Sequence, residues 1–447
     1  MRGSIATVLC ACAALLAGAA AARASGTEVK GVIETQPVSP GDFMNPAFTG
    51  KIDINLHFPA TRDADTGLLV VLHGIGTNFH RYDTECETWV NEYNVITVQV
   101  NYRGTGVPPP GYDFGKYQAI DTLRVVKHVV DTYAVNKQRI FLWGASGGGN
   151  VALHAAKMAP GTFALVAALA PITRPTTEED RMLRGYGTDP AGGWETAMLG
   201  AGGRYTEEEW DIRDAQRLAP YLKRVPVYLL HGDADPVVDW QHSCDLHFAL
   251  LAAGAAVAFI TIQGGDHDFK GALDPTEDSR FKATEKYLRI PLLTQRGTGS
   301  LEQDLQRKIT FPTRGAMAWP VKFDALGQAS LDGIAKPGAV INVPMTQRIV
   351  KRGENLRFGL KIENWVQAPQ HTVLLAGFVE MASAAVLPLL GPLPFLLPAA
   401  GVEGPVALPI PSAFPAGEYL FVAVVVGSAP AGYLDLDFFQ FAVAAVP

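Results

Sequence analysis

Ser146 stands in the segment whose residue types are best suited to chemistry. The apolar run 139–143 is followed by GASGG at 144–148, and residues 151–156 have the composition of a helix. A sharp strand-to-helix turn exposes a serine hydroxyl, and only glycine at both flanks lets strand and helix approach so closely. The start of the helix also places backbone N–H groups where a negatively charged oxygen would form. The segment predicts a nucleophilic Ser146, and a serine that only caps the helix is the alternative.

A serine hydroxyl also needs a base that removes its proton and a third group that holds the tautomer of that base. Two later loops offer such groups. The apolar run 227–230 is followed by three acidic candidates, Asp233, Asp235 and Asp239. In the loop after the next apolar run, two glycines precede His267 and would let the loop bend this imidazole over the serine. His242 and His247 lie in a predicted helix and are interpreted as surface or packing residues.

Two of these segments resemble motifs of the α/β-hydrolase superfamily. GASGG at 144–148 resembles its nucleophile elbow, and HGDADPVV at 231–238 resembles the H-G-x-x-D-x-x-V turn that presents its catalytic acid. This resemblance implies that Asp235 is the acid, whereas Asp233 and Asp239 form the turn. Ser146, Asp235 and His267 then follow the Ser, Asp, His order of the superfamily.

The tetrahedral intermediate of such a reaction needs two hydrogen-bond donors. The backbone N–H of Gly147, directly after the nucleophile, is the first predicted donor. HGIGT at 73–77 resembles the His-Gly oxyanion loop of the superfamily, which implies that the N–H of Ile75 is the second donor, with Gly76 as the alternative. His73 is interpreted as a structural hydrogen-bonding residue beneath this loop. None of these roles uses a metal or a cofactor, so none is expected.

Strands and helices that alternate along the chain must position these residues. Apolar patterning predicts strands at 51–56, 68–72, 95–100, 163–169, 226–230 and 257–262. It predicts helices at 117–133, 240–253 and 277–288. Because most of the strand segments are continuously apolar, they are expected to be covered on both faces. The sequence therefore predicts a doubly wound, mostly parallel α/β-hydrolase sheet within a catalytic domain at 25–297.

The remaining segments predict a cap and a second domain. Residues 172–220 interrupt the alternation, and an insertion there would lie above the serine, so we expect a pocket-shaping cap; an ordinary helix pair is the alternative. After a predicted linker at 298–319, alternating apolar residues predict an all-β, sandwich-like domain at 320–447. Its apolar stretch 384–398 contains four prolines, which exclude a membrane-spanning helix. The stretch is predicted to be either a buried irregular connection or an apolar loop that contacts another molecule.

Composition and the N-terminus limit the class of protein. The chain has 447 residues, of which 48% are hydrophobic, and a formal net charge of −7, so it is globular and long enough for more than one domain. The sequence contains no basic patch that would predict nucleic-acid binding.

Residues 1–24 end in Ala-Arg-Ala after an apolar stretch, which is typical of a secretory signal peptide and predicts a secreted or periplasmic protein. A lipoprotein signal at Cys12 is the alternative. Removal of the signal peptide during export would leave two of the four cysteines, Cys86 and Cys244. In an oxidising compartment these two are expected to be linked or both buried.

A closer resemblance covers about residues 65–290. NYRG at 101–104, Asp121 in the helix before the serine, GASGG at 144–148, Ala-Pro at 219–220 and HGDAD at 231–235 together resemble the catalytic domain of the prolyl oligopeptidase family. That family typically carries an N-terminal β-propeller, whereas only about 40 residues separate the predicted signal peptide from the hydrolase core here. Some members also use a tyrosine hydroxyl in the oxyanion loop, where this chain has His-Gly.

These departures favour an esterase. The sequence predicts a secreted serine hydrolase that cleaves ester bonds through an acyl-enzyme, with a small-molecule ester or a short peptide as substrate. A prolyl oligopeptidase-like serine peptidase is the first alternative. A non-catalytic protein that binds a polymer or a surface on a hydrolase fold is the alternative from another class. No nucleic-acid partner and no transmembrane span are expected, and the C-terminal domain is a candidate for contact with a polymer or a surface.

Overall fold

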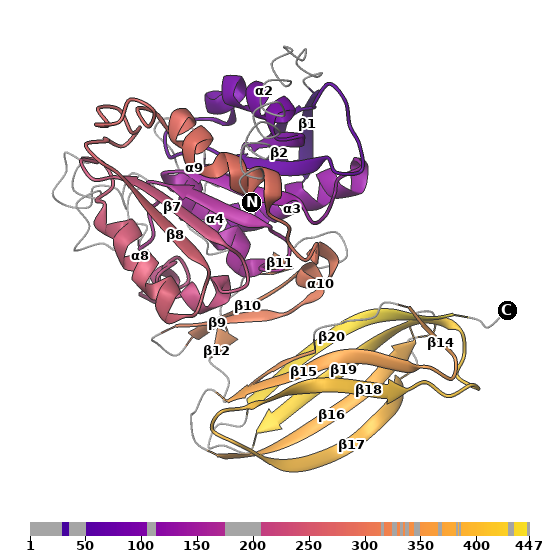
Figure 1. Cartoon of the computed structure of the whole chain (residues 1–447). Helices are drawn as coiled ribbons and strands as arrows, with labels where there is room; N and C mark the ends of the chain where they lie inside the picture. The colour runs from indigo at the N-terminus through magenta and orange to yellow at the C-terminus, as the bar shows by residue number, and fades with distance from the viewer. Residues whose placement is uncertain are drawn as a thin grey trace, which may run out of the picture.

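The chain folds into an α/β domain and a separate body of β-strands (Figure 1). The computed structural model describes residues 29–34, 51–104, 113–174, 207–313, 317–323, 329–330, 334–335, 339–343, 349–364, 369–380, 383, 386–427 and 433–444. The predicted signal peptide and residues 175–206 of the predicted cap lie outside these ranges. The structure therefore describes the whole predicted nucleophile, acid and base segments but only the two ends of the predicted cap.

An eight-stranded sheet forms the centre of the α/β domain, in the order β1-β2-β4-β3-β5-β6-β7-β8. Its strands are β1 (Val29–Glu34), β2 (Lys51–His57), β3 (Gly67–Leu72), β4 (Val95–Val100), β5 (Ile140–Ala145), β6 (Leu165–Leu169), β7 (Val227–Gly232) and β8 (Val257–Ile262). The six strands from β4 to β8 in this order are parallel, whereas β1 and β2 join antiparallel. Every residue of β3, β4, β5 and β6 is buried, as their continuous apolar sequences predict.

Helices cover both faces of this sheet. The main helices are α2 (Asp83–Glu92), α3 (Tyr117–Thr132), α4 (Gly147–Met158), α8 (Gln241–Ala252) and α9 (Arg280–Thr294). Apolar residues of α3, α4 and α8 pack with one face of β3, and those of α2 and α9 pack with the other. Shorter helices are η1 (Phe79–Tyr82), α7 (Glu207–Asp211), η2 (Ala219–Leu222) and α10 (Leu301–Gln306). The predicted doubly wound α/β-hydrolase fold is confirmed.

A buried ion pair connects the loop after β4 to α3. Arg103 Nη2 lies 2.6 Å from Asp121 Oδ1 and Arg103 Nε donates to Asp121 Oδ2 at 2.8 Å. Neither side chain has accessible surface. The bidentate geometry offsets the cost of removing both charges from water.

Described residues within the predicted linker 298–319 pack onto the α/β domain. Leu301 and Leu305 of α10 and Ile309 and Phe311 of β9 belong to the main core of that domain. A small sheet contains β9 (Ile309–Pro312), β10 (Met317–Phe323), β11 (Ala329–Ser330) and β12 (Ile334–Ala335). In this segment the apolar residues recur first at helical spacing, in α10, and then at strand spacing, in β9. A solvated linker does not require such a pattern. The sandwich-like domain therefore begins after β12 and not at residue 320.

The C-terminal strands form two sheets with a common core. One sheet contains β13 (Ala339–Asn342), β15 (Asn355–Asn364) and β18 (Val402–Pro409). The other contains β14 (Ile349–Lys351), β20 (Tyr433–Ala444), β19 (Gly417–Gly427), β16 (Gln370–Glu380) and β17 (Val386–Leu397). Residues of both sheets form one apolar cluster, in which the rings of Phe358 and Phe421 lie 4.6 Å apart. We call this domain the β-sandwich.

Residues 386–397 of the proline-rich stretch are neither a buried irregular connection nor a loop. They form β17, which pairs with β16 at the edge of its sheet, with register shifts in the pairing. Leu389, Leu393 and Leu396 are exposed on it. Edge strands tolerate proline, because a residue without an N–H can face away from the neighbouring strand.

The expectation for the cysteines is also wrong. Cys86 and Cys244 are both free, and Cys86 is buried whereas Cys244 is partly exposed. Cys86 belongs to α2 and Cys244 to α8, and these helices cover opposite faces of the sheet. The sheet therefore separates the two thiols.

Within the described ranges, the search for long apolar helices finds none that could cross a membrane.

Candidate active site

Ser146 forms the turn between β5 and α4. Its φ of 57° and ψ of −124° are strained for a residue with a side chain. A Cβ at Gly144 would lie 2.2 Å from the carbonyl oxygen of Gly148, and a Cβ at Gly148 would lie 2.2 Å from that of Leu72. Both glycines are therefore required for the close approach of β5, α4 and β3. The predicted strand, tight turn and helix around the serine are confirmed in geometry.

Asp235 and His267 come together at the carboxyl ends of neighbouring strands, β7 and β8. His267 Nδ1 lies 2.7 Å from Asp235 Oδ2. His267 and Ser146 line one pocket of about 190 Å³, which we call the Ser146 pocket. No direct hydrogen bond links the serine hydroxyl to the imidazole in the described structure. Such contacts commonly tighten only when substrate binds.

Asp235 has a partner at every position around its carboxylate. Oδ1 accepts hydrogen bonds from the backbone N–H groups of Val237 at 2.8 Å and Val238 at 3.0 Å. Oδ2 contacts His267 and, at 3.2 Å, Nε2 of His231. Burial raises the pKa of Asp235, but the hydrogen bonds from His231 and His267 outweigh burial and hold the pKa well below its usual range. The carboxylate therefore stays ionised at neutral pH.

The other two acidic candidates hold the backbone of their loops. Asp233 Oδ1 accepts from the N–H of Gly264 at 2.6 Å, and Asp239 Oδ1 accepts from the N–H of Gln241 at 3.0 Å. These contacts agree with their interpretation as turn-forming residues.

His231 is a residue that sequence reasoning did not assign to the site. It is fully buried beneath Asp235, and burial lowers its pKa, so the ring is neutral. Its Nδ1 lies 2.7 Å from the hydroxyl of Ser243, and its Nε2 lies 3.0 Å from the carbonyl oxygen of Val238. With a proton on Nε2, His231 donates to the carbonyl oxygen of Val238 and to Asp235 Oδ2, while its Nδ1 accepts a hydrogen bond from the hydroxyl of Ser243. The signal for this role is the spacing of four residues between His231 and Asp235.

The loop after β3 lies against the serine. A Cβ at Gly74 would be 3.2 Å from Ser146 Cβ, and Gly74 and Ile75 both line the Ser146 pocket. His73 stacks on Tyr102 with ring centroids 4.5 Å apart, and its Nδ1 lies 2.9 Å from the carbonyl oxygen of Gly74. Burial lowers the pKa of His73 to about 4, so a neutral ring supports the loop from beneath.

Gly147 begins α4, directly after the serine. The N–H groups of the first helical turn have no acceptor within the helix. The helix dipole also favours negative charge at this end. The N–H of Gly147 is therefore available to an oxygen atom bound at Ser146, although the alternative second donors, Ile75 and Gly76, are not distinguished by these contacts.

Arg280 is a second residue that the sequence analysis missed. Its Nη2 donates to the carbonyl oxygen of His267 at 2.5 Å, and its Nη1 lies 3.2 Å from Asp268 Oδ1. Nη1 also donates to the hydroxyl of Tyr82 at 3.2 Å. Arg280 begins α9, so it fixes the loop that carries His267 to the body of the domain.

The fold is that of the α/β-hydrolase class, and the residues of this pocket are of the types that serine hydrolases use. Residues 81–288 match the model of the prolyl oligopeptidase family, so the predicted resemblance to its catalytic domain is confirmed over this range. No curated protein matches the sequence.

Solved structures share parts of the chain at low identity. They include dipeptidyl peptidase 4 from Porphyromonas gingivalis, with 16% identity, a TM-score of 0.45 and coverage of 60% of this chain and 35% of that chain. A thermostable esterase from Pseudomonas putida has 19% identity, a TM-score of 0.45 and coverage of 63% of this chain and 89% of that chain. An arylesterase has 14% identity, a TM-score of 0.45 and coverage of 65% and 92%. The chain thus spans about a third of the length of the dipeptidyl peptidase.

Proposed function

We propose that this protein is an exported serine hydrolase that cleaves ester bonds of small molecules through an acyl-enzyme. The observation that carries the proposal is the 2.7 Å contact between Asp235 and His267 beside the strained turn of Ser146, in one pocket. A nucleophile, a base and a group that orients the base are the parts that acyl transfer needs.

In the proposed reaction, the Ser146 hydroxyl oxygen attacks the ester carbonyl carbon while His267 Nε2 takes the hydroxyl proton. The negative oxygen of the tetrahedral intermediate accepts hydrogen bonds from the N–H groups of Gly147 and Ile75. The intermediate then expels the alcohol, which takes the proton from His267. A water molecule repeats these steps on the acyl-enzyme, which releases the acid and restores Ser146.

Asp235 acts through His267. Because its pKa is held low, it remains an anion that accepts a hydrogen bond from the Nδ1–H of His267, which leaves Nε2 unprotonated and able to act as a base. The same anion stabilises the imidazolium that forms during attack. His231 holds Asp235 from the opposite side of Oδ2.

A serine peptidase is the second candidate, and the family match over residues 81–288 favours it. Two observations favour esters. The Ser146 pocket holds only about 190 Å³. The strands that the structure describes form the central sheet, the small sheet and the β-sandwich, and none of these is a β-propeller. An ester also needs less help from the protonated histidine, because an alcohol is the better leaving group.

A fluorophosphonate probe tests the nucleophile. The purified protein should be labelled, and Ser146→Ala should not. A folded protein that does not react would instead support the non-catalytic alternative. A matched panel of short-chain esters, aryl esters and peptide amides then separates the two hydrolase candidates, since faster cleavage of proline-containing peptides would favour the peptidase.

Export is a separate part of the proposal and rests on the signal-like sequence at 1–24. Expression in a bacterial host with fractionation should place the protein outside the cytoplasm. N-terminal sequencing of that protein should begin at Ser25, whereas an intact N-terminus would contradict cleavage.

A further inference from the structure

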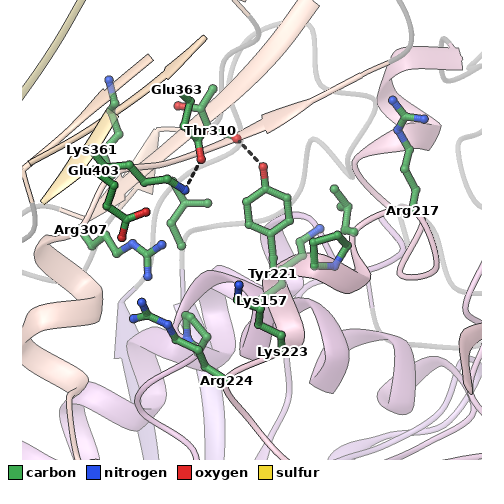
Figure 2. A pocket seen from close by; sticks show the side chains of 15 residues that line it. Lys157, Arg217, Tyr221, Lys223, Arg224, Arg307, Thr310, Lys361, Glu363 and Glu403 are labelled. Carbon is green, nitrogen blue, oxygen red and sulfur yellow. Dashed lines mark hydrogen bonds and ion pairs between the residues drawn. The ribbon is translucent and has the colours of Figure 1, made fainter. Parts of the chain in front are cut away.

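A second, larger cavity lies between the α/β domain and the β-sandwich (Figure 2). It has a volume of about 570 Å³ and continues into a neighbouring cavity of about 1090 Å³. The two cavities share Arg224, Arg307, Lys361 and Glu403, and together we call them the interdomain groove.

The groove is separate from the Ser146 pocket. Arg224 precedes β7 and Lys157 lies in the last turn of α4, so the groove borders the amino ends of the parallel strands. Ser146 lies at the other end of α4, whose 12 residues rise about 18 Å. No residue lines both the groove and the Ser146 pocket in the described structure.

Basic side chains dominate the groove. The cationic residues along it are Lys157, Arg217, Lys223, Arg224, Arg307, Lys308, Arg357 and Lys361. The carboxylates are Asp304, Glu363 and Glu403. Burial lowers the pKa of Lys157 well below its usual range, and its amine already donates to the carbonyl oxygen of Ile212. Positive charge still exceeds negative charge among the residues that line the groove.

Arg224 and Arg307 differ from other cations of the groove in their contacts. Arg217 lies 3.8 Å from Asp211, and Lys361 forms an ion pair with Glu363. In contrast, neither the Arg224 nor the Arg307 side chain makes a hydrogen bond or an ion pair with any described residue. Figure 2 shows both guanidinium groups turned toward the same part of the cavity, next to Glu403.

The two guanidinium groups are close enough to repel each other. Burial lowers the pKa of Arg307, and the charge of Arg224 lowers it further, while the carboxylates of Asp304, Glu363 and Glu403 act in the opposite direction. Arginine nevertheless stays protonated in proteins. A pair of like charges at a partly dry surface is unfavourable, and a bound anion would remove that cost. Guanidinium groups match phosphate, sulfate and carboxylate with two parallel hydrogen bonds.

We propose that the interdomain groove binds a ligand with two or more oxyanion groups, one of which is held between Arg224 and Arg307. Further groups along the channel face Lys223 on the α/β domain and Arg357 on the β-sandwich. Because the groove walls come from both domains, the bound ligand holds them together. This site is independent of the proposed ester hydrolysis.

Calorimetric titration of the full chain tests the site, with tripolyphosphate and citrate as probes at constant ionic strength. We expect saturable binding of at least one probe, and the tighter probe distinguishes a phosphate ligand from a carboxylate ligand. The Arg224→Gln/Arg307→Gln double variant should bind about 10- to 100-fold more weakly, the effect of losing charge-assisted hydrogen bonds. Arg62→Gln, an exposed arginine outside the groove, should bind like the wild type.

Two results would overturn the proposal: no saturable binding of either probe to the wild type, or equal affinities of the double variant and the wild type. Ester turnover by the double variant should be unchanged, which also reports that the α/β domain is folded. Should the double variant fail to fold, the single variants Arg224→Gln and Arg307→Gln replace it, and each should weaken binding.

Discussion

The two ends of the central sheet each hold a buried carboxylate, and the two groups behave in opposite ways. At the carboxyl ends, Asp235 has four partners, two of them imidazole rings, and its pKa is lowered. At the amino ends, Asp304 Oδ2 accepts from the N–H of Gly161 at 2.6 Å and the hydroxyl of Thr162 at 2.9 Å. Burial raises the pKa of Asp304 to about 6. Since burial favours the neutral acid at both sites, the partners decide which carboxyl is ionised.

The arginines differ between the two ends in the same way. Arg280, next to the Ser146 pocket, contacts Tyr82, His267 and Asp268. Arg224 and Arg307, in the interdomain groove, have no such partners within the described chain. The arginine at one end of the sheet is therefore already hydrogen-bonded, whereas the two at the other end are free to pair with the proposed anion. The predictions below test this contrast, beginning with the largest effect.

Loss of the nucleophile or the base should have the largest effect on turnover. Ser146→Ala and His267→Ala should each lower kcat for ester hydrolysis by about 10⁵- to 10⁶-fold, because attack and proton transfer act as one unit. Steady-state kinetics on a short-chain aryl ester measure this loss. A thermal melt of each variant is the control for folding. Near-normal turnover by either folded variant would remove that residue from the mechanism.

The acid should contribute less than the nucleophile. Asp235→Asn keeps the shape of the side chain but removes the anion that selects the tautomer of His267, and we expect kcat to fall by about 10⁴-fold. Asp239→Asn is the matched control in the same loop. It should change kcat by less than about tenfold, since Asp239 accepts a backbone hydrogen bond from Gln241 and does not contact His267 in any described hydrogen bond. The reverse ranking in folded variants would assign the acid to Asp239.

Breaking the buried ion pair should affect stability and not chemistry. Asp121→Asn removes the carboxylate that pairs with the buried charge of Arg103, so the free energy of unfolding should fall by about 3–5 kcal/mol. Asp131→Asn removes an exposed partner of Lys127 from the same helix and should cost no more than about 1 kcal/mol. Guanidinium chloride unfolding compares the two. Equal effects would show that pairing matters no more in the core than at the surface.

Asp304 should produce the smallest of these effects, and one that depends on pH. Burial raises its pKa from 3.8 to about 6, so between these values the folded state binds more protons than the unfolded state. Its contribution to stability is therefore present below pH 4 and is lost as pH rises through 6. The loss amounts to about 3 kcal/mol, because one pKa unit corresponds to about 1.4 kcal/mol.

Asp304→Asn resembles the protonated acid and should lack this pH dependence. Denaturant unfolding at pH 4 and pH 7 measures the difference between the wild type and the variant. A constant difference between the two proteins across this range would mean that Asp304 is already ionised at pH 4.

The nucleophile turn was predictable because its requirements are local. Ser146 and its glycines are contiguous, and the positive φ and the close backbone contacts arise within a few residues. The parallel sheet was predictable from apolar runs that are long enough to be buried on both faces. The assignment of Asp235 came from its position in a motif, and the structure places this residue beside His267. The catalytic roles themselves stay predictions.

The interdomain groove was not predictable, because its cations come from segments far apart in the sequence. Arg224 precedes β7, Arg307 follows α10 and Lys361 belongs to β15, so no window of sequence is basic. Arg280 and His231 were missed for a related reason, since an isolated residue shows its partner only after folding. The packing of Leu301, Leu305, Ile309 and Phe311 onto the α/β domain was not predictable either, because a few apolar residues become part of a core only against the surface that they cover.

The prolines of β17 affect how the protein behaves at high concentration. An edge strand offers unpaired backbone groups to which a strand of another molecule can add, and exposed leucines such as Leu393 and Leu396 would favour that contact. Pro388, Pro392 and Pro394 have no N–H to donate, so an incoming strand cannot form a continuous ladder along this edge. The β-sandwich can thus keep an apolar edge at its surface while its backbone resists growth into cross-β fibres.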